Sequence, residues 1–321
     1  MKIQDRIYGQ VNIEELILLE LMASEPLQRL KGIKQSLSNQ TVSRYEHSLG
    51  VMILLKILKA PLEEQIVGLL HDVPHTAFSH VIDYVFSTAD HSHEFHEKFH
   101  EQMIKKSEIP KILAKYNYDV NKILDEDNFS LLERKLPDLC ADRIDYSLRD
   151  RIAMGEDTSQ IATYLKNLIV KADEIVFTDK NVAKDFAQDY LEMDYKHWSS
   201  PREIALYQIL ANALKLALEH QIISQADLFS DDDFVYQKLQ HSKDPEILKS
   251  LAKISSRLEI MSDKNNYDFY ARNKLRFVDP KFLDPSGQLA RVSQVFPKFK
   301  QILAKHQTWV EAGQYIKIVA Y

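Results

Sequence analysis

Apolar residues recur at spacings of three and four along most of this chain, and this periodicity limits the folds open to it. The pattern is clear in the segments EELILLELMA, LGVMILLKILK and EIALYQILANALKLALEH. Such spacing places apolar side chains on one face of an α-helix, where they can pack against neighbouring helices. Only 7 of the 321 residues are glycine, so few positions interrupt the helices. The sequence therefore predicts an all-α, mainly helical architecture.

Two regions depart from the helical pattern. The segment NLIVKADEIVFTDKNVA has two short apolar runs around a polar turn, which predicts a β-hairpin near residues 167–183. Further on, KLRFVDPKFLDPSG and QYIKIVAY resemble strands. We expect a helical domain over residues 1–261 and a small mixed α/β segment over residues 262–321 that packs on it. Within the helical domain, SSPRE at residues 199–203 has the cap and proline of a helix start, and the helix should run to about residue 220.

The composition excludes several classes of protein. Hydrophobic residues make up 45% and charged residues 27%, as in ordinary folded soluble proteins. The net charge of −6 argues against nucleic acid as a partner and gives no attraction to anionic membranes. The N-terminal MKIQDRIYGQ lacks the apolar core of a secretory signal, and no segment has eighteen uninterrupted apolar residues. With a single cysteine, Cys140, in an apolar context, we expect a buried thiol and a cytoplasmic protein.

Histidine and aspartate residues gather at the ends of two successive predicted helices. His47 stands at the start of the first helix, and the pair His71 and Asp72 stands at the end of the second. An antiparallel helical hairpin would bring these residues to one level. Imidazole and carboxylate groups that converge from rigid elements suit a divalent metal, although a His-Asp pair alone is a weak signal. The later segment CADRIDYSLRD adds Asp142 to the candidate ligands.

Four segments, in order, resemble the signature of the HD-domain metal-dependent phosphohydrolases. They are RYEHSLGV, LLHDVPHTAFSH, HEKFHEQMI and ADRIDYSLRD. Together with the N-terminal QRLKGIKQ, they are similar to the branch of deoxynucleoside triphosphate triphosphohydrolases that includes the SAM-and-HD-domain enzyme. The resemblance covers about residues 4 to 151. It implies the mainly helical HD-domain fold and a phosphoric ester hydrolase.

The resemblance also implies roles for individual residues. The metal ligands would be His47, His71, Asp72 and Asp142. The catalytic residues would be His75, His80 and His96, with Asp83 orienting His80. The substrate would be held by Arg44, Arg143, Tyr146 and Asp150, with Tyr207 stacking on a sugar. The cofactor would be a divalent ion, and this ligand set accepts Mg, Mn, Fe, Co, Ni or Zn.

Other polar residues near these motifs have simpler interpretations. His91, His93 and His100 are interpreted as ordinary core or surface residues. Asp145 either caps a helix or pairs with an arginine. The acidic run SDDD at residues 230–233 is interpreted as a helix cap rather than a second metal site, because acidic residues are favoured at helix N-termini.

The function implied by the resemblance is metal-dependent hydrolysis of nucleotides, with removal of triphosphate from a dNTP as the leading reaction. The chain lacks a glycine-rich insertion between Gln35 and His47, and it has Ser199 and Glu203 where the triphosphohydrolases carry cations, with Arg202 as a candidate replacement. A nucleotidase or phosphodiesterase with another phosphorylated substrate therefore stays open. So does a catalytically idle nucleotide-binding regulatory module, although the full ligand set argues against it. A homodimer is the expected assembly.

Overall fold

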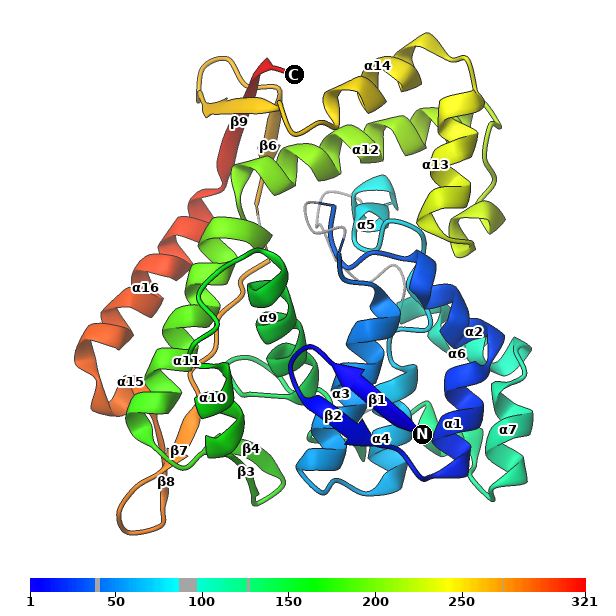
Figure 1. Cartoon of the computed structure of the whole chain (residues 1–321). Coiled ribbons are helices and arrows are strands. Elements are labelled where there is room, and N and C mark those ends of the chain that lie inside the picture. The colour runs from blue at the N-terminus through cyan, green and yellow to red at the C-terminus, as the bar shows by residue number, and fades with distance from the viewer. Residues whose placement is uncertain (38–40, 87–96, 126–127, 273) are drawn as a thin grey trace.

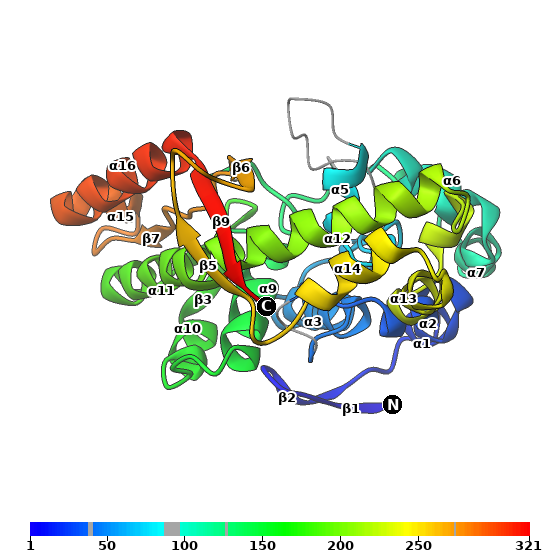
Figure 2. The ribbon, with the colours of Figure 1, turned by 90° about the horizontal axis from the view of Figure 1, so that it is seen from above.

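The computed structural model describes residues 1–37, 41–86, 97–125, 128–272 and 274–321. Within these residues, helices form most of the molecule, and three small sheets lie among them (Figures 1 and 2). This confirms the predicted mainly helical fold with a small β-hairpin and a mixed C-terminal segment. In the same residues, none of the helices combines the length and apolar character needed to span a bilayer.

The elements follow the chain in a simple order. The helices are α1 (Leu16–Ala23), α2 (Glu25–Arg29), η1 (Leu30–Gly32), α3 (Arg44–Ile57), α4 (Leu62–Leu70), α5 (Val81–Phe86), α6 (Glu97–Lys106), α7 (Ile109–Lys115), α8 (Val120–Ile123), α9 (Ala141–Ala153), α10 (Ile161–Asn167), α11 (Lys180–Met193), the π-helical turn η3 (Asp194–Trp198), α12 (Pro201–Glu219), η4 (Ala226–Phe229), α13 (Asp232–His241), α14 (Pro245–Lys253), α15 (Val292–Val295) and α16 (Pro297–Ala312). The strands are β1 (Lys2–Asp5), β2 (Gly9–Asn12), β3 (Leu168–Lys171), β4 (Glu174–Phe177), β5 (Glu259–Ser262), β6 (Phe269–Ala271), β7 (Lys281–Leu283), β8 (Leu289–Arg291) and β9 (Gln314–Ala320).

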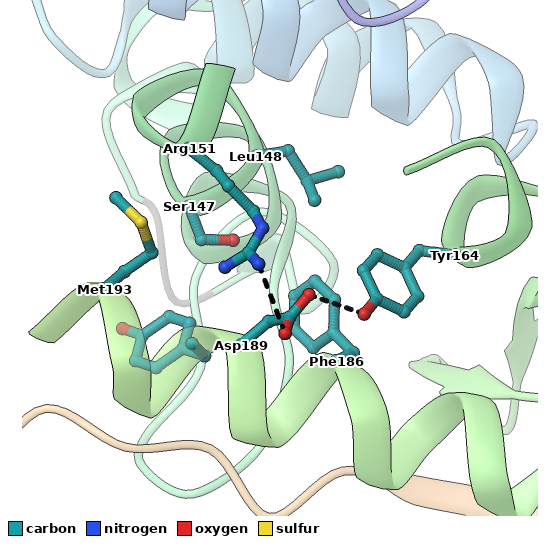
Figure 3. Close-up of a pocket in the computed structure, with 8 residues that line it drawn as sticks. Ser147, Leu148, Arg151, Tyr164, Phe186, Asp189 and Met193 are labelled. Atoms are coloured by element: carbon teal, nitrogen blue, oxygen red, sulfur yellow. Dashed lines mark hydrogen bonds and ion pairs between the residues drawn. The ribbon is translucent and has the colours of Figure 1, made fainter. Parts of the chain in front are cut away.

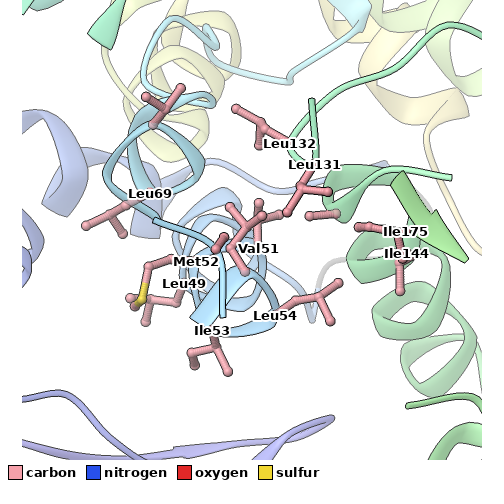
Figure 4. Packing of buried hydrophobic residues seen from close by; sticks show 14 of the residues in the cluster. Leu49, Val51, Met52, Ile53, Leu54, Leu69, Leu131, Leu132, Ile144 and Ile175 are labelled. Carbon is pink, nitrogen blue, oxygen red and sulfur yellow. The ribbon is translucent and has the colours of Figure 1, made fainter. Parts of the chain in front are cut away.

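The hairpin of α3 and α4 forms the centre of the fold. A reciprocal capping box starts α3: the Ser43 hydroxyl accepts from the Glu46 N–H at 3.2 Å, and the Glu46 carboxylate accepts from the Ser43 N–H at 3.0 Å. The apolar residues of α3 are buried against α4, α9 and the segment before α9 (Figure 4). The antiparallel return of α4 brings the His71 ring to 5.2 Å from the His47 ring, between centroids. The predicted hairpin is therefore confirmed.

Helix α9 crosses α3 at very close range. At Gly50, an added Cβ would lie only 2.0 Å from Asp145 Oδ1 and 2.0 Å from Arg149 Nη2. Because glycine has no side chain, α9 can place a buried carboxylate and a buried guanidinium directly against the backbone of α3. Glycine at this position therefore sets the distance between the two helices.

The N-terminal hairpin of β1 and β2 is an element that the periodicity did not predict. Its turn is fixed by Asp5, whose Oδ1 accepts from the N–H groups of Ile7 at 2.7 Å and Tyr8 at 3.0 Å. Gly9 follows with φ +70°, a conformation that favours glycine. The turn directs Asp5 and Tyr8 toward α9, where both contact residues that support the site described below.

Helix α12 spans the molecule between the C-terminal sheet and α13 (Figure 1). Its start is capped as predicted, since the Ser200 hydroxyl accepts from the Glu203 N–H at 3.2 Å. At α13, Asp231 Oδ1 accepts from the Phe234 N–H at 2.8 Å, which confirms that the acidic run contains a helix cap. Against one side of α12 pack α5, α13 and α14 through a second apolar cluster.

The C-terminal segment is joined to the rest of the chain by strand pairing. Strand β4 of the predicted β3–β4 hairpin pairs in parallel with β7, giving the order β3-β4-β7-β8. The last strand, β9, lies between β5 and β6 and is antiparallel to both. Strands β7 and β9 thus pair with β4 and β5, while the division into a helical domain over residues 1–261 and a segment over residues 262–321 that packs on it stays a prediction.

The close approach at Gly50 leads to a first prediction. We expect Gly50→Ala to lower the free energy of unfolding by roughly 3 kcal/mol, because the new methyl group must displace a buried charged pair. Chemical denaturation measures the change. Ser48→Ala, on the same helix, is the control: the Ser48 hydroxyl is buried and has no hydrogen-bond partner among the described residues, so its removal should be nearly neutral. Equal stabilities for the two variants would contradict the prediction.

Candidate active site

A cavity of about 960 Å³ lies between the central helices and the C-terminal segment. Most of the described residues with a predicted site role line it, and they are Arg44, His47, His71, Asp72, His75, His80, Asp142, Arg143, Tyr146, Asp150 and Tyr207. Asp83 does not line it, and His96 lies outside the described residues, as do His91 and His93. The cavity therefore brings together residues that are spread over more than half of the chain.

Three of the predicted metal ligands converge at one end of this cavity. The donor atoms of His47, His71 and Asp142 all lie within 4.8 Å of one another. The Asp142 Oδ1 atom is 2.9 Å from His47 Nε2 and 3.7 Å from His71 Nε2. Asp72, the fourth predicted ligand, lies beside them, with Oδ1 at 3.5 Å from His71 Nε2. Asp72 is thus adjacent to the group of three donor atoms but is not part of it.

The far nitrogen of each histidine ring is held by a hydrogen bond. His47 Nδ1 lies 2.7 Å from Asp145 Oδ2, and His71 Nδ1 lies 2.8 Å from the carbonyl oxygen of Gly68. Both acceptors favour a proton on Nδ1, which leaves the Nε2 lone pair directed at the carboxylates. An imidazole lone pair repels the carboxylate oxygen that it faces, unless a cation or a proton lies between the two atoms. This arrangement fits a metal ion.

The electrostatics of the cluster support the same conclusion. Burial lowers the pKa of His47, but hydrogen bonds with Asp142 and Asp145 outweigh this effect and raise it to about 10. Burial also lowers the pKa of His71, but the charge of Asp72 and the hydrogen bond and charge of Asp142 together outweigh burial and raise this pKa above its usual value. The surrounding carboxylates thus favour a positive charge at both imidazoles, which is the position where a cation would be bound.

With neutral imidazoles, the buried cluster has an excess of negative charge. Its carboxylates and guanidinium groups are those of Asp5, Asp72, Asp142, Asp145, Arg44 and Arg149. Four carboxylates and two guanidinium groups leave two negative charges, which a divalent cation would balance. The donor set of nitrogen and carboxylate oxygen suits Mn, Fe, Co, Ni or Zn, and Mg through its oxygens. The residues present thus fit the implied divalent ion.

A buried network behind His47 holds the site together. Asp145 accepts from Arg149 Nε at 2.9 Å, from Arg149 Nη2 at 2.8 Å and from the Tyr8 hydroxyl at 2.9 Å. Arg149 Nη2 also reaches Asp5 Oδ2 at 3.1 Å. The predicted pairing of Asp145 with an arginine is correct, but its bond to His47 was not foreseen. The only signal in the sequence was the spacing of Asp145 and Arg149 by one helical turn.

Besides His47 and His71, four histidines line the cavity, namely His75, His80, His197 and His100, the last of which was interpreted from the sequence as an ordinary core or surface residue. His75 Nε2 lies 3.1 Å from Asp72 Oδ1, and the rings of His75 and His80 meet edge to face at 5.1 Å. His80 Nδ1 is 3.4 Å from Asp83 Oδ2, which is the pairing that the sequence predicted. The His80 side chain is 33% exposed, while Asp83 is buried. A carboxylate thus orients an imidazole that faces the open part of the cavity.

The two predicted phosphate-binding arginines are partly engaged by protein groups. Arg44 Nη1 lies 3.1 Å from Asp72 Oδ2, and its Nε donates to the Ser79 hydroxyl at 3.0 Å. Arg143 Nη2 donates to Glu133 Oε1 at 2.5 Å. The preceding Cys140 is buried, as predicted, and burial raises its pKa well above the usual range.

Glu133, Cys140 and Asp142 form a second group of potential metal ligands. The Arg143 guanidinium, however, contacts two members of this group, with Nη1 only 3.2 Å from Cys140 Sγ. A positive charge is therefore already present among them. This group is consequently a poor candidate for a second metal.

Aromatic side chains form a wall of the cavity beside the ligand set. The Tyr146 ring lies 5.2 Å from Trp198 and 6.4 Å from His47, between centroids, and its hydroxyl bonds to that of Tyr190. Asp150 accepts from Trp198 Nε1 at 2.8 Å. Trp198 and Tyr190 were missed from the sequence. The π-helical turn η3, which places Trp198, gave no periodic signal.

Tyr207 lines the cavity as predicted and meets Tyr84 edge to face at 5.7 Å. Arg202, the expected cationic replacement near it, is turned away: its guanidinium donates to the carbonyl oxygens of Leu258 at 2.6 Å and Ser255 at 2.8 Å. That expectation is wrong, because these backbone acceptors hold Arg202 outside the cavity lining. Cationic residues instead reach the cavity from other segments, namely Arg134, Lys135, Lys274, Arg276 and Arg291.

A second, much smaller cavity of about 10 Å³ lies between α9, α10 and α11 (Figure 3). Asp189 there accepts from the Tyr164 hydroxyl at 2.6 Å and lies 3.4 Å from Arg151 Nη2. This volume is enough for about one water molecule. The ion pair therefore has a structural role and offers no ligand site.

Comparisons with known proteins agree with this geometry. The HD domain family model matches residues 44–150. The protein YdhJ of Bacillus subtilis is 40% identical over 99% of this chain and 99% of its own length. The metal-dependent phosphohydrolase cns2 of Cordyceps militaris is 31% identical over 98% of this chain and 92% of its own.

More distant similarities extend the comparison. The deoxynucleoside triphosphate triphosphohydrolase SAMHD1 homolog of Dictyostelium discoideum is 25% identical, covering 83% of this chain and 59% of its own length. The crystal structure of a phosphohydrolase from Bacteroides thetaiotaomicron has the same fold, with a TM-score of 0.73, 18% identity and full coverage of both chains. The triphosphohydrolase branch is thus a distant relative of this chain.

The network behind His47 leads to a second prediction. We expect Asp145→Asn to weaken Mn²⁺ binding by roughly 10- to 100-fold, because the amide no longer fixes the His47 ring as a carboxylate does. Calorimetric titration of the metal-free protein with Mn²⁺ measures the affinity. Asp189→Asn is the matched control, since Asp189 pairs with an arginine and a tyrosine away from the ligand set. An unchanged affinity in Asp145→Asn would rule out the orienting role.

Proposed function

This chain belongs to the HD-domain metal-dependent phosphohydrolase superfamily, and we propose that it hydrolyses nucleotides, with a dNTP as the leading substrate and inorganic triphosphate as a product. One observation carries the proposal. A single cavity contains the candidate metal ligands at one end, aromatic rings on its wall and cationic side chains around it. These three kinds of surface match the reacting phosphoryl group, the nucleoside and the remaining phosphates of such a substrate.

The ligands would be His47, His71, Asp72 and Asp142. A divalent ion bound there supplies Lewis acidity toward a phosphoryl oxygen and lowers the pKa of a coordinated water. The protein's part is to hold the ligands in place. Asp145 fixes the His47 ring, the Gly68 carbonyl fixes the His71 ring, and Arg44 fixes the Asp72 carboxylate. These hydrogen bonds preorganise the donor atoms.

Proton transfer is assigned to His80. Its ring faces the cavity, and Asp83 lies behind it at 3.4 Å from Nδ1. The His80 ring is assigned the exchange of a proton with the leaving oxygen or with the attacking water. His75, between His80 and Asp72, is the second histidine near the reacting group. His96 is retained as a third candidate from the family resemblance.

The nucleoside is assigned to the aromatic wall. Tyr146, Trp198 and Tyr207 present ring surfaces to the cavity, which suit stacking on a base or contact with a sugar. Asp150 accepts from Trp198 Nε1 and lines the cavity, and its carboxylate is assigned to a sugar hydroxyl. Arg143, which lines the same cavity, is assigned to a phosphate.

A nucleotidase or phosphodiesterase is the second candidate. The orientation of Arg202 favours it, since this side chain is absent from the cavity and its place near Tyr207 is taken by the buried Glu203. A carboxylate there disfavours several adjacent phosphates. The products separate the two reactions, because a triphosphohydrolase releases inorganic triphosphate and the alternatives release orthophosphate or a nucleoside monophosphate.

A third prediction tests the proposal. We expect the Mn²⁺-loaded protein to release inorganic triphosphate from dNTPs, and we expect EDTA to abolish the reaction until Mn²⁺ is restored. Asp72→Ala should lower kcat by at least about 100-fold, because it removes a ligand and the partner of Arg44. Chromatography of the products measures both effects.

Asp185→Ala serves as the control, because Asp185 is a solvent-exposed residue of α11 with a side chain 48% exposed. Its activity should match that of the unmodified protein. Release of orthophosphate or pyrophosphate instead would move the substrate to the second candidate function. Bound Mn²⁺ without turnover of dNTPs, NTPs, nucleoside monophosphates or cyclic nucleotides would contradict the proposal.

A further inference from the structure

Arg276 lies in the connection between β6 and β7, far along the chain from the segment that matches the HD domain. Its side chain lines the cavity together with Lys274, which is exposed at the surface. The HD match ends at residue 150. The C-terminal segment thus adds positive charge to a cavity whose ligand set comes from the central helices.

Most arginines that line the cavity donate hydrogen bonds to oxygen atoms of the protein. Arg44 donates to Asp72 and Ser79, and Arg143 donates to Glu133. Arg134 and Arg291 are likewise held, by the carbonyl oxygens of residues 173 and 279 and by nearby carboxylates. These groups have structural partners that hold them in their present positions.

Arg276 differs from all of these. Among the described residues, its guanidinium donates no hydrogen bond, and its nearest carboxylate oxygen, Asp194 Oδ1, is 4.0 Å from Nη1. A charge-assisted hydrogen bond to a carboxylate is typically about 2.7–2.9 Å long. The side chain is only 26% exposed. A partly buried guanidinium with unused donors that faces a cavity is suited to bind an anion.

The backbone that carries Arg276 is anchored from behind. His306, on α16, donates from Nε2 to the Arg276 carbonyl oxygen at 2.9 Å and lies 3.2 Å from Asp194 Oδ2. Asp194 also accepts from the Ser199 hydroxyl at 2.7 Å. Both Asp194 and His306 are fully buried. These contacts fix the point from which the arginine side chain extends.

The charge of Arg276 acts on the aromatic wall of the cavity. It interacts electrostatically with the hydroxyl groups of Tyr84, Tyr190 and Tyr207. The Tyr207 hydroxyl also interacts electrostatically with Arg44, and Arg44 contacts Asp72 in the ligand set. Arg276 and these tyrosines line the same cavity as the proposed metal ligands, so this cavity gives a ligand access to both groups.

We propose that Arg276 binds a second phosphate of the substrate, remote from the phosphoryl group at the ligand set. This inference rests on the proposed phosphohydrolase function and narrows the substrate class to compounds with two or more phosphate groups. The planar guanidinium presents paired N–H donors that match two oxygens of one phosphate. Partial burial strengthens this contact, because little water competes for the charge.

The test compares two anions that need no turnover. Inorganic triphosphate and orthophosphate are titrated into the Mn²⁺-loaded protein, its Arg276→Gln variant and its Arg276→Lys variant. We expect Arg276→Gln to weaken triphosphate binding by roughly tenfold or more, the effect of one charged hydrogen-bonding partner. Orthophosphate, bound at the metal, should change by less than about twofold. Arg276→Lys should give an intermediate affinity, because it keeps the charge and loses the paired donors.

Arg272→Gln is the matched control. Arg272 is exposed, lies four residues earlier, and donates to the Tyr270 hydroxyl instead of lining the cavity. Its affinities for both anions should equal those of the unmodified protein. For a nucleotide substrate, Arg276→Gln should raise KM with little change in kcat, whereas general disruption of the site would lower kcat as well.

The outcomes separate this inference from the proposed function. Equal triphosphate affinity in Arg276→Gln and the unmodified protein overturns the role of Arg276, whether or not nucleotides are hydrolysed. Loss of triphosphate binding in Arg276→Gln, without nucleotide turnover by any variant, leaves the anion site in place and refutes the dNTP reaction. If Arg276→Gln does not fold, Arg276→Lys decides: weaker triphosphate binding with unchanged orthophosphate binding supports the role, and unchanged binding of both overturns it.

Discussion

The buried contact between Asp145 and Arg149 is the interaction on which the site and the fold both depend. It lies where α9 meets α3, and the glycine at position 50 makes room for it. Removing one partner of such a buried pair typically costs about 3–5 kcal/mol, a large share of the roughly 5–15 kcal/mol that stabilises a domain. The same carboxylate holds the His47 ring at 2.7 Å. The Asp145 carboxylate therefore contributes both to the contact between the two helices and to the orientation of a predicted metal ligand.

The cavity is completed by parts of the chain that contribute no predicted metal ligand. Strands β7 and β8 extend the β3–β4 hairpin, while β9 pairs with β5 and β6 (Figure 2). Between these two sheets the chain carries Arg276 past the cavity, and α16 anchors it through His306. The helical centre thus carries the predicted metal ligands, and the C-terminal segment contributes part of the cavity wall. Because of this division, substitutions in the C-terminal segment can change the charge of the cavity wall without changing the predicted metal ligands.

The sequence predicted the local features well because they depend on neighbouring residues. Helical periodicity located α3 and α4, and cap residues such as Ser200 and Asp231 located helix starts. An antiparallel hairpin of these two helices is enough to predict that His47 and His71 lie close together, as they do. The partners of Asp145 were not predictable in this way, because Tyr8 lies 137 residues away and the N-terminal hairpin that carries it gave no periodic signal. Arg202 failed as a prediction because backbone carbonyl oxygens compete for its guanidinium.

The engagement of Arg44 with Asp72 is compatible with the substrate role proposed for it. A guanidinium has five N–H donors, and Arg44 uses its Nε and Nη1 for Ser79 and Asp72. The Nη2 group has no hydrogen bond to the described residues, and the side chain lines the cavity. One arginine can therefore hold a predicted metal ligand and donate to a phosphoryl oxygen at the same time. A phosphate bound there and the Asp72 carboxylate would both interact with the charge of Arg44. Substrate binding would therefore be coupled to the position of a predicted metal ligand through this one side chain.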